Sequence, residues 1–396
     1  MEYEIIHLRK SQWKGHVLPM GYKTEEYYEV SVDRSENGFA MKMEKKRAEP
    51  PIVHTPEEYD FPDKLYEDWW TNACAWGVLI NEKLVAAIET DLEKWSNRLR
   101  ITELWVAPEY QKKGIGRALM ETAKEQARLM RSRAVILETQ SCNINAIGFY
   151  LHEGFTLIGF DSCCYSNRDI ERKEVRIELG WFPEKRTKLS KGEVEIRQEK
   201  PEDYMAVEQM TQEAFWNKYK KGCDEHYLVH KLRNHPDYLS ELSRIAVVEG
   251  EVAGAVFYSK SKVKSEDSEW DVLTFGPLCV RPDFQGRGIG EMLLKETMQL
   301  AKEAEYPGIV IFGEPDYYPR AGFRTCDAFG ITTADGRNFD AFLGIELKEG
   351  AMKGICGRFY ESEVFESLAL EKVEAYSKRF PEKKKQYFPC QWSKEE

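Results

Sequence analysis

The chain has 396 residues, more than one hydrophobic core usually holds together, so its length predicts two domains, or two domains with an appendage. Its composition, 42% apolar and 12% aromatic, is that of a globular protein, and no apolar run reaches the roughly 20 residues that a membrane-spanning helix needs. The net charge of −11 argues against a nucleic-acid partner, because proteins that bind nucleic acids usually present a basic face.

Cysteine and histidine usage predicts a cytoplasmic protein without a metal site. The first residues, "MEYEIIHLRK", lack the basic-then-apolar order of a signal peptide. The nine cysteines have irregular spacings that match no zinc motif, so we expect free thiols. His226 and His230 in "HYLVH" stand one helical turn apart, but no glutamate follows His226, so we expect an ordinary amphipathic helix.

In chain order, the first half predicts a hairpin, a strand, a glycine-rich loop, a helix and a second strand. "AWGVLI" and "LVAAIET" flank the turn "NEK" at 81–83, and "LRITELWV" at 99–106 is typical of a strand. This strand leads into the loop "APEYQKKGIG" at 107–116. "AVILET" at 134–139 is then a short buried strand. Between loop and strand, four apolar residues recur at helical spacing: Leu119, Ala123, Ala127 and Met130.

The second half repeats this order after a linker. The stretch 182–197 is polar and contains Pro and Gly, which places a domain boundary near 185–192. "RIAVVEG" and "EVAGAVFYS" predict a hairpin, and "DVLTFGPLCV" predicts a strand that leads into the loop "RPDFQGRGIG" at 281–290. A helix over 289–303 and the strand "GIVIFG" complete the series.

The two halves are also related residue by residue. "VAPEYQKKGIGRAL" (106–119) and "VRPDFQGRGIGEML" (280–293) share seven identities in fourteen positions, at an offset of 280 − 106 = 174 residues. A second shared motif follows in each half, because "FYLHEGF" (149–155) and "YYPRAGF" (317–323) both place a tyrosine four residues before Gly-Phe. Two motifs in the same order, separated by the length of a whole domain, indicate a duplicated domain.

The glycine loops do not match the common nucleotide-binding motifs. Neither has the lysine and hydroxyl of a phosphate-binding P-loop, and the dinucleotide pattern fails because Leu119 and Glu291 stand where a third glycine is needed. What remains is a turn that lets the backbone approach an anion, such as a pyrophosphate, at a helix N-terminus. The alternative is a loop that only turns the chain. Three basic residues add positive charge: Lys112, Lys113 and Arg287.

Together these motifs resemble the GNAT superfamily of acetyl-CoA-dependent N-acetyltransferases. The first half, with "ELWVAPEYQKKGIGRAL", "LETQSCNINAIGFYLHEGFTLIGFD" and "ELGWF", is similar to streptothricin acetyltransferases. The second half, with "FGPLCVRPDFQGRGIGEMLL" and "GEPDYYPRAGF", is similar to bacterial N-acetyltransferases that carry a G-[DE]-P-x-Y-Y-x-R-x-G-F run. The resemblance covers roughly 73–180 and 193–347, and it is less clear for 21–65 and 350–396.

The resemblance implies an α/β fold with two tandem acetyltransferase domains, each with a mixed sheet that opens beside its glycine loop. The first domain is expected to span 1–187 and the second 188–350. Residues 351–396 are expected to form a C-terminal extension that packs on the second domain.

The resemblance also implies that acetyl-CoA is the cofactor, with its pyrophosphate on the loop N–H groups and its pantetheine arm against the preceding strand. In the first half the implied binding residues are Val106, Gln111, Lys112, Lys113, Gly114, Ile115, Gly116, Arg117 and Asn143. In the second half they are Val280, Gln285, Gly286, Arg287, Gly288, Ile289, Gly290 and Glu291, and Gly-Glu-Pro replaces the asparagine segment.

Three residues are candidates for the chemistry of acetyl transfer. The resemblance assigns Tyr150, and Tyr318 in the second half, to protonation of the departing thiolate. An alkylamine with a pKa near ~10.4 must lose a proton before it attacks a thioester, and Glu103 is the candidate base. The alternatives are a surface carboxylate for Glu103 and a packed aromatic for Tyr150.

The predicted reaction is acetyl transfer from acetyl-CoA to a primary amine of a small cationic substrate, such as an aminated antibiotic. Glu103 and Asp161 are expected near the amine entrance, and Pro277 stands at the position that matches Glu103, so the first half is expected to carry the main activity. The alternatives are a non-catalytic acetyl-CoA sensor or structural module, and an enzyme for protein or peptide amines. The halves could pack as an internal pseudo-dimer in a monomer, or the chain could form a homodimer.

Overall fold

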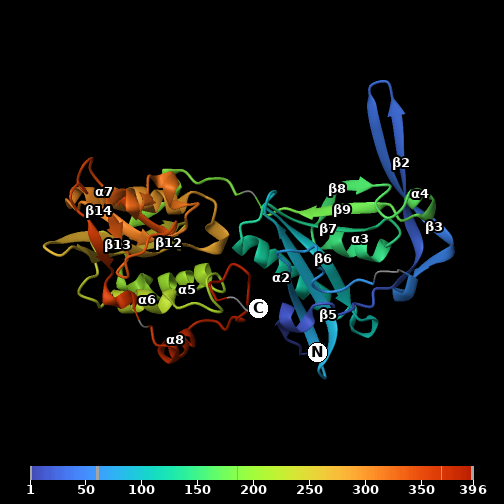
Figure 1. The fold of residues 1–396 in the computed structure, drawn as a ribbon, viewed down its shortest axis with the longest axis horizontal. Helices are drawn as coiled ribbons and strands as arrows, with labels where there is room; N and C mark the ends of the chain where they lie inside the picture. Colours follow the sequence, from blue (N-terminus) through green and yellow to red (C-terminus); the bar gives the residue numbers. More distant parts are fainter. Residues whose placement is uncertain (1, 59–61, 185, 367, 394–396) are drawn as a thin grey trace. The chain divides into compact units, whose positions relative to one another are not determined.

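The computed structural model describes residues 2–58, 62–184, 186–366 and 368–393, and Figure 1 draws the fold. The chain forms two compact units. One consists of Met1–Glu184 together with Gln386–Glu396, and the other of Lys185–Lys385. Each unit therefore contains one copy of the glycine-loop motif.

Seven strands form the sheet of the first unit, in the order β1-β4-β5-β6-β7-β9-β8. β6 and β7 run parallel, and the other neighbours run antiparallel. The predicted hairpin is β4–β5, and the predicted strands on either side of the helix are β6 and β7, so these predictions are confirmed. The strands are β1 (Ile5–Leu8), β4 (Cys74–Ile80), β5 (Lys83–Glu93), β6 (Arg98–Val106), β7 (Ala134–Gln140), β8 (Thr156–Asp161) and β9 (Arg176–Trp181).

The sheet of the second unit repeats this plan strand for strand. Its main path is β10-β11-β12-β13-β14-β17-β15, with β13 and β14 as the parallel pair, and β18 joins β12 and β16 beside it. The shared order confirms that the sequence repeat is a duplicated fold. The strands are β10 (Glu195–Arg197), β11 (Arg244–Val248), β12 (Glu251–Lys264), β13 (Glu269–Val280), β14 (Gly308–Phe312), β15 (Arg324–Thr325), β16 (Ile331–Thr332), β17 (Phe342–Glu346) and β18 (Gly357–Tyr360).

Each sheet opens where its two parallel strands separate. β6 and β7 pair only from Arg98 to Arg100, and Leu99 lies opposite Val135. β13 and β14 pair at Leu273 opposite Ile309, which is the same pair displaced by the 174-residue repeat. Beyond these pairs the strands no longer share hydrogen bonds, so each sheet has a split that leads to its glycine loop.

A long helix follows each glycine loop and packs its apolar face on the sheet. Leu119, Ala123 and Ala127 of α2 (Ile115–Leu129) are fully buried, as the helical spacing predicts, and α7 (Ile289–Glu303) occupies the predicted range in the second unit. Among the described residues, no helix has both the length and the apolar character needed to cross a membrane. The other helices of the first unit are α1 (Lys10–Trp13), α3 (Ile144–His152) and α4 (Asp169–Arg172).

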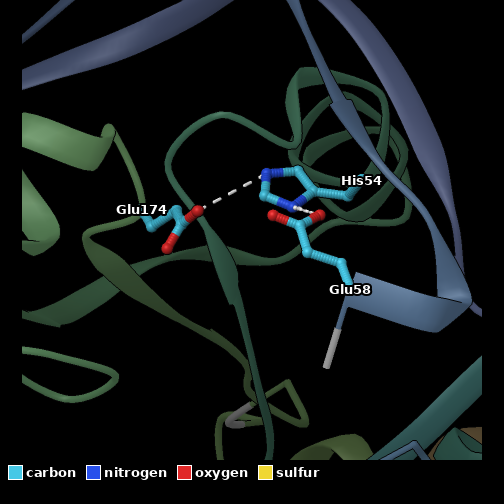
Figure 2. Close-up of side chains that lie close together, drawn as sticks. All are labelled: His54, Glu58 and Glu174. Carbon is cyan, nitrogen blue, oxygen red and sulfur yellow. Dashed lines mark hydrogen bonds and ion pairs between the residues drawn. The ribbon is translucent and has the colours of Figure 1, made fainter. Parts of the chain in front are cut away.

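A two-stranded hairpin of β2 (Tyr22–Ser35) and β3 (Gly38–His54) projects from the first unit (Figure 1). His54 lies at its root and is 4% exposed. Nδ1 of His54 is 2.9 Å from Glu58 and Nε2 is 3.7 Å from Glu174 (Figure 2). These side chains are close enough to hold a metal ion, but the carboxylates meet different nitrogens of one ring. The contacts of His54 with Glu58 and Glu174 therefore hold the base of the hairpin against the rest of the first unit.

Helices α5 (Tyr204–Phe215), α6 (Glu225–Leu232) and α8 (Leu370–Ser377) belong to the second unit. The helix predicted from "HYLVH" is α6. His226 on this helix is fully buried and lies 2.9 Å from the Ser377 hydroxyl, and burial lowers its pKa to about 4. It is a neutral core histidine at neutral pH.

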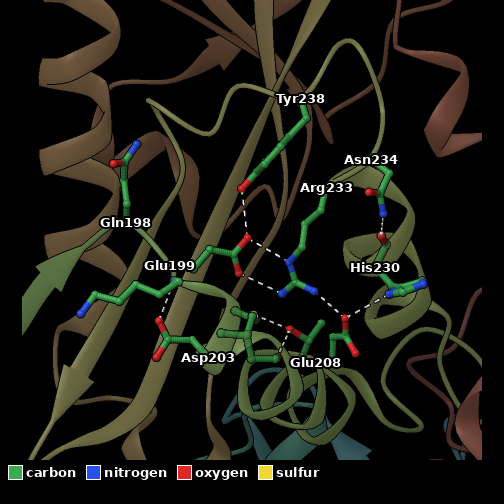
Figure 3. Close-up of polar contacts among 12 residues, drawn as sticks. Gln198, Glu199, Asp203, Glu208, His230, Arg233, Asn234 and Tyr238 are labelled. Carbon is green, nitrogen blue, oxygen red and sulfur yellow. Dashed lines mark hydrogen bonds and ion pairs between the residues drawn. The ribbon is translucent and has the colours of Figure 1, made fainter.

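A buried ion network joins these helices (Figure 3). The guanidinium of Arg233 donates two hydrogen bonds of 2.9 Å to Glu199 and a third to Glu208. All three side chains are at least 92% buried. The hydroxyl of Tyr376, on α8, donates to Glu208 at 2.6 Å, and that of Tyr238 donates to Glu199 at 3.2 Å. The network therefore fixes α8 to the rest of the second unit.

The C-terminal extension is divided between the two units, whereas the sequence predicts that all of it packs on the second domain. The part up to Lys385 belongs to the second unit, and the segment that starts at Gln386 belongs to the first. There the indole N–H of Trp76 donates to the Tyr387 carbonyl at 3.2 Å, and Phe388 is 1% exposed. Burial of these aromatic residues is the physical reason for the difference.

We expect Arg233→Ala to lower the free energy of unfolding of the second unit by about 3–5 kcal/mol, because two buried carboxylates would lose their partner. Urea unfolding followed by circular dichroism measures this. The matched control is Arg337→Ala, because Arg337 pairs with Asp335 on the surface and should cost less than about 1 kcal/mol. Equal losses in the two variants would contradict a stabilising role for the network.

Candidate active site

The first glycine loop is shaped by side-chain and backbone contacts that fix it at the end of β6. The Gln111 side chain donates to the Val106 carbonyl at 3.0 Å and so ties the loop to the strand. Gly114 caps α2 with φ +85°, and a Cβ there would meet no atom within 4 Å. Glycine is therefore favoured by the left-handed backbone and not by a lack of space. Lys112 also adopts positive φ, at +57°.

The amide groups of this loop are available to a ligand. In the described part of the chain, the N–H groups of residues 112–117 make no hydrogen bond to a backbone carbonyl or a side chain. They surround the N-terminus of α2, where unpaired N–H groups and the helix dipole favour an anion. Lys112 and Lys113 add positive charge, whereas the Arg117 guanidinium is engaged by Glu153 at 3.0 Å. The residues present therefore suit a pyrophosphate.

The second loop has the same construction with one tighter contact. Gln285 donates to the Val280 carbonyl at 3.0 Å, and Gly288 caps α7 with φ +91°. A Cβ at Gly290 would lie 2.8 Å from the Tyr317 hydroxyl, so this position needs glycine for close approach. Gly286, with φ +77°, stands where the first loop has Lys112.

The linker reaches the carbonyl groups of the second loop. Leu189 donates its N–H to the Arg287 carbonyl at 2.9 Å, and Arg186 donates to the Pro282 carbonyl. Ile289, Gly290 and Glu291, at the start of α7, have no backbone partner for their N–H groups among the described residues. The second loop therefore also retains free N–H donors.

Tyr150 and Glu103 lie close enough to influence one another. Tyr150 is on α3, 9% exposed, and its ring packs against Phe155 at 6.1 Å between centroids. Burial raises the pKa of its hydroxyl, and the negative charge of Glu103, on β6, raises it further. The hydroxyl is therefore protonated at neutral pH. The candidate acid is therefore within electrostatic range of the candidate base.

Glu103 belongs to a cluster of carboxylates. Burial raises its pKa well above the ordinary range for glutamate, and the nearby negative charges contribute as well. Glu138, one of these carboxylates, forms ion pairs with two arginines, Arg100 at 3.5 Å and Arg176 at 2.5 Å. The carboxylates that act on Glu103 are Asp63, Glu89, Glu67 and Glu138.

Glu89 is a residue that sequence reasoning missed. It lies directly across from Glu103 in the β5–β6 pair, is fully buried, and has a pKa raised to about 7 by burial. It accepts a 2.9 Å hydrogen bond from Thr102, the extra residue of a bulge in β6. The signal that could have revealed it is the pairing of β5 with β6, which places Glu89, in an apolar strand, directly opposite Glu103.

Two other predicted residues have different surroundings. Asn143 caps α3, and its side-chain oxygen accepts the Ala146 N–H at 3.2 Å. Asp161 lies at the end of the edge strand β8, where it accepts the Cys163 N–H at 2.9 Å. The expectation that Asp161 joins Glu103 at the amine entrance is therefore wrong, because β7 and β9 separate the strands that carry them.

Tyr318 has the same packing in the second unit as Tyr150 in the first. Its ring lies 5.6 Å from Phe323 and 5.7 Å from Phe275, and the Phe323 N–H bonds its carbonyl at 3.4 Å. Pro277, at the position that matches Glu103, follows Gly276 in the corresponding bulge of β13. The second split therefore has the tyrosine, but a proline stands on β13 where β6 has Glu103.

Each half of the chain matches a family of known proteins. The model of the acetyltransferase (GNAT) family matches residues 42–155, and that of an acetyltransferase (GNAT) domain matches residues 241–325. The streptothricin acetyltransferase of Escherichia coli is 32% identical over 126 residues, which cover 32% of this chain and 70% of that protein.

The uncharacterized N-acetyltransferase YhbS of Escherichia coli strain K12 is 29% identical over 163 residues, which cover 41% of this chain and 92% of that protein. The crystal structure of YhbS from Escherichia coli in complex with CoA is 26% identical, covers 45% of this chain and 94% of its own, and gives a TM-score of 0.40. With a matching domain in each half, and with a relative above 30% identity that is covered over more than two thirds of its length, this chain belongs to the GNAT family of acetyltransferases.

Proposed function

We propose that the protein transfers acetyl from acetyl-CoA to a primary amine of a small cationic substrate, and that the first unit carries the main activity. The observation that carries the proposal is the proximity of a buried tyrosine and a desolvated glutamate, Tyr150 and Glu103, beside the split between β6 and β7. Membership of an acetyltransferase family supports the reaction type.

The residues of the first unit divide the work of acetyl transfer. The N–H groups of 112–117 hold the pyrophosphate of acetyl-CoA, and the edge of β6 near Val106 holds its pantetheine arm. Glu103 removes a proton from the bound ammonium, directly or through water, so that the nitrogen can attack the thioester. Tyr150 protonates the thiolate that leaves.

The charges around the split support a cationic acceptor. Four carboxylates lie near Glu103, and among the described residues one of them, Glu138, forms ion pairs with two arginines. Such a site attracts an amine that carries several positive charges and binds it before proton removal. The name of the relative from Escherichia coli, a streptothricin acetyltransferase, supports an aminated antibiotic as the substrate class.

A sensor that binds acetyl-CoA without transferring acetyl would keep the loop but would not need the Glu103–Tyr150 pair. Thiol release from acetyl-CoA with a panel of amines separates the two functions. An enzyme releases thiol, whereas a sensor is only stabilised against heat by the ligand. A panel that includes lysine-containing peptides tests the alternative of a peptide acceptor.

We expect Tyr150→Phe to lower turnover by about 10²–10⁴-fold, because the thiolate would lose its proton donor, with little change in acetyl-CoA affinity. Tyr318→Phe should matter less for the same cationic acceptor. Steady-state thiol release and calorimetric titration of acetyl-CoA measure the two quantities. If Tyr318→Phe abolishes the reaction and Tyr150→Phe leaves it unchanged, the main activity belongs to the second unit.

We expect kcat/KM to rise with pH as Glu103 loses its proton, because only the ionised carboxylate can act as a base. Its raised pKa moves this rise above the pH at which an ordinary glutamate ionises. Glu103→Gln should remove this limb and leave only the rise due to ionisation of the free amine, near pH ~10. The matched control is Asp161→Asn, which should keep the wild-type profile. An unchanged limb in Glu103→Gln would exclude Glu103 as the base.

A further inference from the structure

The end of β14 in the second unit carries a carboxylate that the comparison with Glu103 does not reveal. Glu314 is two residues beyond the end of β14, on the opposite side of the split from Pro277. The hydroxyl of Tyr219 donates to its Oε1 at 2.7 Å, and the ammonium of Lys218 lies 3.7 Å from the same oxygen. The second split therefore has a carboxylate after all, supplied by the segment that follows β14.

The first unit has an equivalent hydrogen bond from a tyrosine hydroxyl, but its acceptor is a neutral glutamine and not a glutamate. Gln140 ends β7, and the 174-residue repeat places it opposite Glu314. Its side-chain oxygen accepts a hydrogen bond from Tyr22, just as that of Glu314 does from Tyr219. In both units a tyrosine hydroxyl thus donates to the side chain at this equivalent position, which is the last residue of β7 in the first unit and lies two residues beyond β14 in the second. The acidic group is on β6 in one unit and after β14 in the other.

Glu314 and Tyr318 are held in one turn. The N–H groups of Tyr317 and Tyr318 donate to the Glu314 carbonyl at 3.0 and 3.3 Å. A Cβ at Gly313 would lie 2.4 Å from the Tyr318 ring, so the ring lies directly against the end of β14. Burial raises the pKa of the Tyr219 hydroxyl, and the charges of Glu314 and Tyr318 act in the same direction. The three groups therefore form one cluster.

The C-terminal extension packs against the bulge of β13. A Cβ at Gly276, in the bulge of β13, would lie 3.3 Å from the Phe365 ring. Phe365, Val364 and Leu368 share one hydrophobic cluster with Phe215 and Tyr219. This hydrophobic cluster therefore contacts the bulge of β13 and also contains Tyr219, the partner of Glu314.

We infer that the second unit has an acceptor site of its own, in which Glu314 takes a proton from the amine and Lys218 binds a carboxylate of the same acceptor. The inference rests on the proposed acetyl transfer. The Lys218 ammonium and the Glu314 carboxylate lie within 4 Å of each other. The side chain of Glu314 is 36% exposed and that of Lys218 is 23% exposed. This pair matches a small zwitterion such as a free amino acid, whereas a polycation would meet the positive charge of Lys218.

Acetyl transfer at this site needs two proton transfers, one from the amine and one to the departing thiolate. One proton passes from the ammonium of the amino acid to the Glu314 carboxylate. The freed electron pair forms the N–C bond to the acetyl carbon, the C–S bond breaks, and the thiolate takes the proton of the Tyr318 hydroxyl. The second proton on nitrogen leaves to solvent, and the proton held by Glu314 returns to the Tyr318 oxygen.

Thiol release by the full-length Tyr150→Phe variant tests the inference, because this background lowers the contribution of the first site. The probes are free L-amino acids and the matching amino acid amides, which keep the amine but lack the carboxylate. We expect turnover with at least one amino acid, which falls about 10²–10⁴-fold when Glu314→Gln is added. Lys218→Met should raise KM for the acid about 10- to 100-fold and abolish the preference over the amide.

Glu349→Gln, an exposed glutamate of the second unit, is the matched control and should change neither quantity. Circular dichroism of each variant checks the fold. The inference is overturned if the wild-type protein acetylates cationic amines but the Tyr150→Phe background turns over no amino acid, or if Glu314→Gln leaves that turnover unchanged. If the wild-type protein releases no thiol with any amine, the proposed function itself fails.

Discussion

The structure depends on the place where each pair of parallel central strands stops pairing. A parallel pair needs a crossover, and here the glycine loop and the long helix supply it in both units. Because β6 and β7 share hydrogen bonds only at Arg98–Arg100, the rest of β6 presents its edge to a ligand. The free N–H groups of the loop lie at the end of that edge. We therefore infer that one interruption in the ladder provides both the open strand edge and the place for the anion.

The repeat preserves this geometry and redistributes the charge around it. The same parallel pair, the same glutamine-to-strand contact and the same tyrosine packing recur in both units. The carboxylate beside the split does not recur at the same position, because Glu103 corresponds to Pro277 and Gln140 to Glu314. The repeat thus keeps the groups that we propose to meet the acetyl donor and changes those that we propose to meet the acceptor.

Much of the fold could be predicted because its signals are local. The alternation of apolar residues gave the hairpins, and the helical spacing after the loop gave α2, with Leu119 buried as expected. The carboxylate cluster could not be predicted in full, because it depends on which strands are neighbours. Glu89 faces Glu103 through strand register, whereas Asp161 is separated from it by β7 and β9. The C-terminal segment also makes contacts that are distant in sequence, as Trp76 and Tyr387 show.

We expect both splits to accept acetyl-CoA. Calorimetric titration of the full-length protein with acetyl-CoA, in the absence of an amine, measures the number of sites directly. We expect two acetyl-CoA molecules bound per chain, because each unit has an open strand edge and free N–H groups at its helix. Saturation at one molecule per chain would contradict it.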